Sequence, residues 1–276
     1  MSVKKDASGR RSIQVEVEVP GTPEQVWQAI ATGPGISSWF VPTKMDEHEG
    51  GTIVCNFGPG MDSVATITAW EPTHRFAAES QAGNMGPNSP PLGSEWIVEA
   101  RSGGTCIVRV VHSLFTDSDD WDKELESVES GWPMFFQILR IYLENFRGQR
   151  CSTFQVMGFT PESESTAWEK VTRSLNLSGV TKGEQRSSSG GAPPLAGVVE
   201  RIVEGKSPNV LVLRVDKPAP GVAYLFAQMM GEQVCVMAAF YLYGDESAGA
   251  AASNEPLWQA WMNEHFPAAG NASTVA

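Results

Sequence analysis

The sequence has few of the residues that build disulfide frameworks or metal sites. Its four cysteines are far apart and form no C-x-x-C pair, and its four histidines form no H-E-x-x-H array; the cysteines are Cys55, Cys106, Cys151 and Cys235. A disulfide scaffold and a structural zinc site are therefore disfavoured. We expect free thiols that are buried or half-buried, no metal and no cofactor.

Positive charge and long apolar runs are also scarce. Twenty Lys and Arg stand against 32 Asp and Glu, which gives a net charge of −12. The negative electrostatic field of such a chain disfavours the binding of phosphate backbones, so nucleic acid is not an expected partner. No run approaches the roughly 20 apolar residues of a membrane helix, and the polar start at residues 1–12 has no apolar signal core. We expect a cytoplasmic protein with no membrane partner.

Short catalytic signatures are missing as well. Although the chain has 27 glycines, none forms a G-x-G-x-x-G loop, a Walker loop or a G-x-S-x-G elbow. Enzyme classes that depend on such local motifs are disfavoured, and the sequence assigns no catalytic residue.

The first half has a clear pattern of alternating strands. Ile13 to Val19 alternate apolar and polar side chains, as a strand with one buried face does. Thr22 can then cap a helix, with Pro23 in its first turn and Gln25 completing a capping box, and Gly33-Pro34-Gly35 is expected to end that helix. Further alternating segments are predicted at 53–57, 64–70, 75–80, 95–100 and 108–114.

A long helix is predicted over 132–147. Its apolar side chains cover most of the circumference, which a curved sheet wrapped around the helix would bury. The acidic stretch before it, residues 117–129, breaks the strand pattern. We interpret this stretch as a solvated charged face; the alternative places its acids in the first turn of a helix.

This order of elements, together with several short motifs, resembles the SRPBCC superfamily, whose members adopt the START-like helix-grip fold. Within it, about residues 12–148 are similar to the family named for the activator of the heat-shock-protein-90 ATPase. The matching pieces are Val26–Ile30, Ile36–Phe40, Glu49–Gly51, Trp70–Phe76, Gly104-Thr105 leading to His112-Ser113, and Gly131–Pro133. The resemblance implies an α+β fold, a curved antiparallel sheet around a long C-terminal helix, and says little about the ligand.

The second half resembles a degenerate copy of the first. Thr160-Pro161-Glu162 repeats Thr22-Pro23-Glu24, Trp168 and Val171 echo Trp27 and Ile30 after an insertion, and strands are predicted at 154–159, 198–203, 210–215, 222–228 and 234–243. We predict a helix-grip domain over 1–150 and a truncated one over 151–276, with a flexible loop at 178–194 and a short helix at 256–266. In the alternative, these strands extend the sheet of the first domain.

A helix-grip fold encloses a cavity between its sheet and its long helix, and the alternation selects the side chains that face it. We predict eleven ligand-binding residues, namely Trp39, Phe57, Trp70, Trp96, Val98, Val110, His112, Trp132, Phe136, Leu139 and Leu143. Aromatic walls with few polar groups favour a hydrophobic or aromatic small molecule. The alternative is that these side chains fill a solid core.

His112 is the titratable side chain that the alternation places inside. It could serve as an acid or base, but a buried structural histidine is favoured because no carboxylate is clearly placed beside it; Asp62 and Glu95 only lie near strand ends.

Three functions remain open. The leading hypothesis is a non-catalytic binding protein for a hydrophobic small molecule. The alternatives are an enzyme of the polyketide cyclase or hydrolase kind that uses His112, and a chaperone-associated interaction protein. Strands missing from the second copy would leave an apolar sheet edge, which favours either domain–domain packing or a homodimer.

Overall fold

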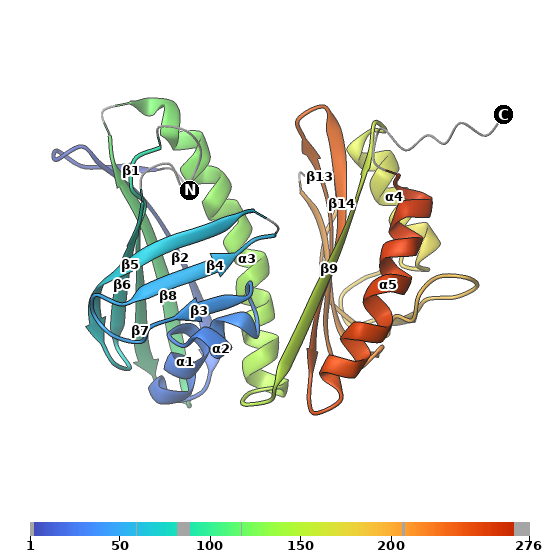
Figure 1. The fold of residues 1–276 in the computed structure, drawn as a ribbon, viewed down its shortest axis with the longest axis horizontal. Helices are drawn as coiled ribbons and strands as arrows, with labels where there is room; N and C mark the ends of the chain where they lie inside the picture. The colour runs from blue at the N-terminus through green and yellow to red at the C-terminus, as the bar shows by residue number, and fades with distance from the viewer. Residues whose placement is uncertain (1–2, 59, 82–88, 117, 206–207, 268–276) are drawn as a thin grey trace. The chain divides into compact units, whose positions relative to one another are not determined.

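The computed structural model describes residues 3–58, 60–81, 89–116, 118–205 and 208–267. The chain divides into two compact units, residues 1–147 and 148–276. Each unit has one antiparallel sheet of its own, so the second-half strands do not extend the first sheet. The predicted α+β helix-grip fold, with a second smaller copy, is confirmed (Figure 1).

The first unit is an eight-stranded sheet with a long helix. Its order is β1-β2-β8-β7-β6-β5-β4-β3, so the first long strand pairs with the last and a meander fills the rest. The strands are β1 (Lys4–Lys5), β2 (Arg10–Pro20), β3 (Thr43–Met45), β4 (Thr52–Asn56), β5 (Asp62–Glu71), β6 (Arg75–Ser80), β7 (Gly93–Arg101) and β8 (Thr105–Phe115).

The first helix, α1 (Pro23–Ile30), begins where the sequence predicts. Thr22 is the N-cap, and Gln25 completes the capping box by accepting from the Thr22 backbone N–H. Val26, Trp27 and Ile30 are buried on one side of α1. Helix α1 ends before Gly33-Pro34-Gly35, as expected, and these residues also open a second short helix that was not predicted, α2 (Gly33–Ser37), capped by Thr32.

The long helix α3 (Asp122–Asn145) begins ten residues before the predicted start. Most of the acidic stretch therefore lies in α3 and in the 3-10 turn η1 (Asp119–Trp121) before it, while residue 117 lies outside the described residues. Asp119 and Asp122 both form ion pairs with the buried Arg11 of β2. The preferred interpretation as a solvated face is wrong for Asp122, which lies in the first helical turn and ties α3 to the sheet.

The second unit repeats this connectivity with fewer strands. Its order is β10-β11-β12-β13-β14-β9, so again the first strand pairs with the last, which leads into the final helix. The elements are β9 (Cys151–Thr160), α4 (Glu164–Ser174), β10 (Gln185–Ser187), β11 (Ala196–Val203), β12 (Asn209–Lys217), β13 (Gly221–Met230), β14 (Gln233–Tyr243) and α5 (Ser247–His265).

Details of the second unit differ from the sequence expectations. The cap of α4 is Ser163, whose Oγ accepts from the Thr166 N–H, and not Thr160. Counted from Ser163, Trp168 and Val171 occupy the positions that Trp27 and Ile30 occupy after Thr22, so no insertion is needed. The segment 178–194 contains the short strand β10, and α5 begins nine residues before the predicted start, at Ser247.

The interior of the second unit is filled by its own side chains. Phe240 stacks on Phe154 at 4.6 Å between ring centroids and contacts Trp258 at 4.8 Å. Gly158 of β9 lets α5 approach closely, since a Cβ there would lie 2.6 Å from Cβ of Phe266. This helix therefore packs directly on its sheet.

One edge of the second sheet is the short strand β10, whose Gln185 and Ser187 are exposed. The expected apolar edge is therefore wrong at this strand, because short polar strands are how sheets protect their edges. The homodimer stays a prediction.

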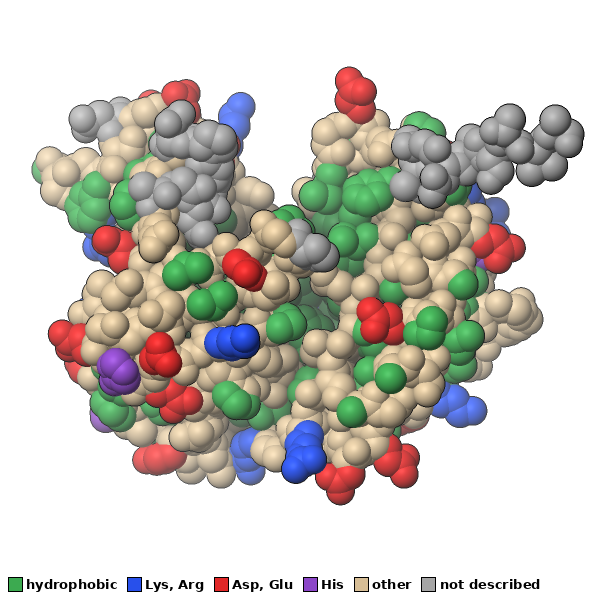
Figure 2. Space-filling view, viewed as in Figure 1, with side chains coloured by type: hydrophobic (Ala, Val, Ile, Leu, Met, Phe, Trp, Pro, Cys, Tyr) green, Lys and Arg blue, Asp and Glu red, His purple; other side chains and the backbone are tan. Residues whose placement is uncertain are grey.

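Charged side chains are spread over the surface. On the face shown in Figure 2, Lys and Arg side chains stand singly or in small groups among acidic ones. In the described part of the chain, no helix has the length and apolarity to span a bilayer. The described residues also contain no cluster of His, Cys, Asp and Glu suited to hold a metal ion.

Candidate ligand-binding cavity

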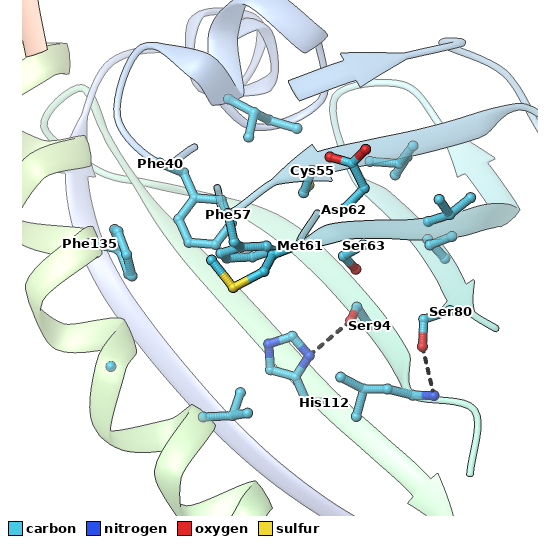
Figure 3. Close-up of a pocket in the computed structure, with 18 of the residues that line it drawn as sticks. Phe40, Cys55, Phe57, Met61, Asp62, Ser63, Ser80, Ser94, His112 and Phe135 are labelled. Atoms are coloured by element: carbon cyan, nitrogen blue, oxygen red, sulfur yellow. Dashed lines mark hydrogen bonds between the residues drawn. The ribbon is translucent and has the colours of Figure 1, made fainter. Parts of the chain in front are cut away.

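The first unit contains a cavity of about 910 Å³ between α3 and the sheet. One wall comes from the N-terminal half of α3, where Val128, Gly131, Trp132 and Phe135 face inward. The opposite wall comes from β4, β5, β6, β7 and β8, and the segment after α2 adds its aromatic side chains. The side chains around it are drawn in Figure 3.

Phe40 is the centre of an aromatic group at this cavity. Its ring stacks on Trp132 at 5.3 Å and meets Phe135 edge-on at 4.6 Å. Phe57, from the end of β4, meets Phe40 at 5.6 Å. Phe57 and Met61 are 42% and 52% exposed, so apolar side chains reach solvent at the rim of the cavity (Figure 3). Exposed apolar side chains at a rim are typical of a ligand entrance.

Five of the predicted ligand-binding residues line this cavity. They are Trp39, Phe57, Trp96, His112 and Trp132. They come from five separate segments: Trp96 from β7, His112 from β8, Trp132 from α3, Trp39 from after α2 and Phe57 from after β4. Whether they bind a ligand stays a prediction.

The other six lie outside the cavity wall, namely Trp70, Val98, Val110, Phe136, Leu139 and Leu143. The reason is α1, which packs against α3, β7 and β8 and closes one end of the space. Its Trp27 meets Trp70 at 5.1 Å and Phe76 at 5.9 Å. Five of these side chains therefore belong to a packed core, where Val110 and Leu139 are fully buried, and Trp70 is half-buried at its edge.

Several cavity residues were not predicted. Ser94 lies two residues before Trp96 in β7, so extending the same alternation by one step would have found it. Phe135 belongs to the apolar face of α3 that the sequence already shows. Cys55 lies two residues before Phe57 on the same alternation, so it could have been found too. Phe40 and Met61 have no such signal, because the segment after α2 and the β4–β5 turn bring them to the cavity.

His112 is held by hydrogen bonds on both ring nitrogens. Trp132 Nε1 lies 2.9 Å from His112 Nε2. Ser94 Oγ lies 2.8 Å from His112 Nδ1 (Figure 3). An indole N–H only donates, so His112 Nε2 is the acceptor and the ring proton sits on Nδ1. His112 therefore donates from Nδ1 to the hydroxyl oxygen of Ser94.

Burial lowers the pKa of His112 from 6.5 to about 4. A proton on Nε2 would also face the N–H of Trp132, so that two donors would meet with no acceptor between them. At neutral pH the ring is therefore neutral, with one fixed tautomer.

Neither Asp62 nor Glu95, the two carboxylates that the sequence places near strand ends, orients the ring of His112. Glu95 forms an ion pair with Arg75, which lies on the neighbouring strand β6. Asp62 lines the cavity but accepts a 2.6 Å hydrogen bond from Asn56 Nδ2. The ring is thus oriented by an indole and a hydroxyl and not by a carboxylate.

The chain is similar to one protein family and to several solved structures. The family described as "Activator of Hsp90 ATPase homolog 1-like protein" matches residues 20–144. No curated protein matches the chain. Similar structures include the di-domain ARO/CYC BexL from the BE-7585A biosynthetic pathway, which is 14% identical with a TM-score of 0.43, over 94% of this chain and 99% of that one.

Two other similar structures match about half of the chain. CalU16 from Micromonospora echinospora is 20% identical with a TM-score of 0.41, over 52% of this chain and 83% of its own. The Aha1 dimer from Colwellia psychrerythraea is 22% identical with a TM-score of 0.40, over 49% of this chain and 96% of its own. The family match over residues 20–144 confirms the resemblance seen in the motifs.

Proposed function

We propose that the first domain binds an apolar, aromatic small molecule in the cavity between α3 and the sheet. The observation that carries this proposal is the cavity itself: about 910 Å³, open at a rim of exposed apolar side chains and walled mainly by apolar side chains, seven of them Phe or Trp. Cavities of this size with a few polar groups are typical of small-molecule sites.

The enzyme alternative would need His112 to exchange a proton with the substrate. Both of its nitrogens are engaged by Trp132 and Ser94, and its lowered pKa keeps it neutral. A general base needs a free nitrogen within reach of the substrate. This geometry supports binding over acid–base catalysis by His112.

Gly131 offers a direct test. It lies in α3, faces the cavity, and a Cβ built on it meets no atom within 4 Å. Gly131→Leu therefore adds a side chain at the cavity wall from a position whose Cβ is unobstructed, and Leu is a better helix former than Gly. The matched control is Ser130→Leu, which adds the same side chain to the exposed neighbouring position of α3.

The experiment is titration of each protein with an apolar fluorescent probe, 1-anilinonaphthalene, together with mass spectrometry of the freshly purified native protein. We expect the wild type and Ser130→Leu to bind one probe per chain and Gly131→Leu to lose at least tenfold in affinity. Equal binding by all three proteins would contradict the proposal.

A further inference from the structure

The hydrogen bonds around His112 form a chain in which each group donates to the next, and Ser94 is the last acceptor of this chain. Trp132 Nε1–H donates to His112 Nε2, and His112 Nδ1–H donates to Ser94 Oγ. The hydroxyl hydrogen of Ser94 therefore cannot point to His112 and is left to donate elsewhere.

Ser94 stands on the cavity wall with room in front of it. In the sheet it pairs with His112 on β8 and with Ala78 on β6, and all three side chains line the cavity. The small methyl group of Ala78 leaves the space beside the hydroxyl open. Ser80 differs, since its Oγ already accepts from Leu92 N–H at 3.1 Å and lies 3.5 Å from the Gln81 carbonyl oxygen.

The charges around the cavity restrict what can accept this hydrogen bond. Among the described side chains that line it, none is Lys or Arg, and Asp62 is the carboxylate. A carboxylate ligand would be desolvated without a counter-charge and repelled by Asp62, whereas a neutral carbonyl oxygen needs only one donor.

Resting on the proposed function, we propose that Ser94 is the polar recognition residue of the cavity. Its hydroxyl donates a hydrogen bond to a neutral carbonyl oxygen of an otherwise apolar ligand. The chemical class of this ligand is an aromatic or polycyclic ketone. Trp132 and His112 are positioning residues, because they act on the ligand through the direction in which they hold the Ser94 hydroxyl.

Two probes of nearly equal shape separate this inference from binding in general: 2-acetylnaphthalene, which has the carbonyl, and 2-isopropylnaphthalene, which lacks it. We expect Ser94→Ala to lose about threefold to tenfold in affinity for the ketone and nothing for the hydrocarbon, the range of one neutral hydrogen bond. The matched control is Ser113→Ala, the same deletion next to His112 on the other face of β8, and it should bind both probes as the wild type does.

Two further measurements do not depend on Ser94→Ala folding. The carbonyl stretch of the ketone bound to the wild type should lie at a lower wavenumber than in hexane. In Trp132→Phe, Nε2 of His112 can take the ring proton and Ser94 can donate back to Nδ1. The ketone should therefore lose its advantage over the hydrocarbon in this variant.

The outcomes are distinct. If the hydrocarbon binds but the ketone has no advantage and an unshifted carbonyl stretch, the Ser94 inference is overturned while apolar binding stands. If neither probe binds the wild type, the proposed function fails and the inference fails with it.

Discussion

The rings of His112 and Trp132 lie nearly parallel, 5.5 Å apart with an angle of 19° between their planes, and are joined by a hydrogen bond from indole to imidazole. His112 is 6% exposed, so this pair holds a titratable group inside the domain in its neutral form. Such a pair makes the stability of the domain depend on pH.

The first prediction concerns acid. The pKa of His112 is about 4 in the folded domain and near 6.5 in an unfolded chain, so between these values the unfolded state binds more protons. The contribution of neutral His112 to the free energy of unfolding is therefore fully present above pH 6.5, and it is lost as the pH falls toward 4. Between pH 7 and 4.5 we expect this loss to lower the free energy of unfolding by about 2–3 kcal/mol.

Urea unfolding followed by tryptophan fluorescence measures this effect. His112→Gln is the comparison, because its amide oxygen can accept from Trp132 without titrating. The wild type should lose about 2–3 kcal/mol more than this variant on going from pH 7 to 4.5. An identical loss in both proteins would show that His112 does not carry the acid sensitivity.

The second prediction separates core from cavity. Leu139 is fully buried away from the cavity, so Leu139→Ala should destabilise the domain by about 2–5 kcal/mol with little effect on probe affinity. Leu92 is half-buried and lines the cavity, so Leu92→Ala should weaken probe binding with a smaller loss of stability. Melting temperature and probe titration are measured on the same samples. A reversed pattern would place the ligand at the α1 end of the domain.

The third prediction concerns two glycines in helices. A Cβ on Gly35 of α2 would lie 1.9 Å from the Gln28 carbonyl oxygen and 2.9 Å from that of Ala29, the last carbonyls of α1. Gly35→Ala should therefore force α2 away from α1 and destabilise the domain by about 1–3 kcal/mol or more. Gly131→Ala meets no atom within 4 Å and should stabilise α3 by about 0.5–1 kcal/mol. Urea titration of both variants checks the opposite signs, and a stable Gly35→Ala would refute the close approach.

The fourth prediction uses the thiol of Cys55 as a reporter. Cys55 lines the cavity, and burial raises its pKa while a 3.5 Å hydrogen bond from Thr43 opposes that shift. Saturation with 2-isopropylnaphthalene should slow its alkylation by N-ethylmaleimide at pH 8, measured by peptide mass spectrometry. Cys151, half-buried in the second unit with a pKa raised to about 12, is the internal control and should react at the same slow rate with or without ligand. Unchanged labelling of Cys55 would place the ligand elsewhere.

Much of the fold could be predicted because its signals are local. The alternation of Ile13 to Val19 and the Thr22–Gln25 capping box depend on residues within a few positions of one another, and both are present. The starts of α3 and α5 were missed because Pro133 and Pro256 lie inside these helices, where a proline usually indicates a helix start or a break. Asp122 was missed because its partner, Arg11, lies more than a hundred residues earlier.

By itself, the sequence determined which side chains of each strand and helix face inward, because the periods of two and 3.6 residues are properties of the backbone. Only the tertiary structure decided which of these inward positions border an open space. Trp27 of α1 fills one end of the space between α3 and the sheet, whereas Gly131 has no side chain to fill the other. The path from Trp132 through His112 to Ser94 likewise exists only after three distant segments pack together, since a hydrogen bond needs its two atoms within about 3 Å.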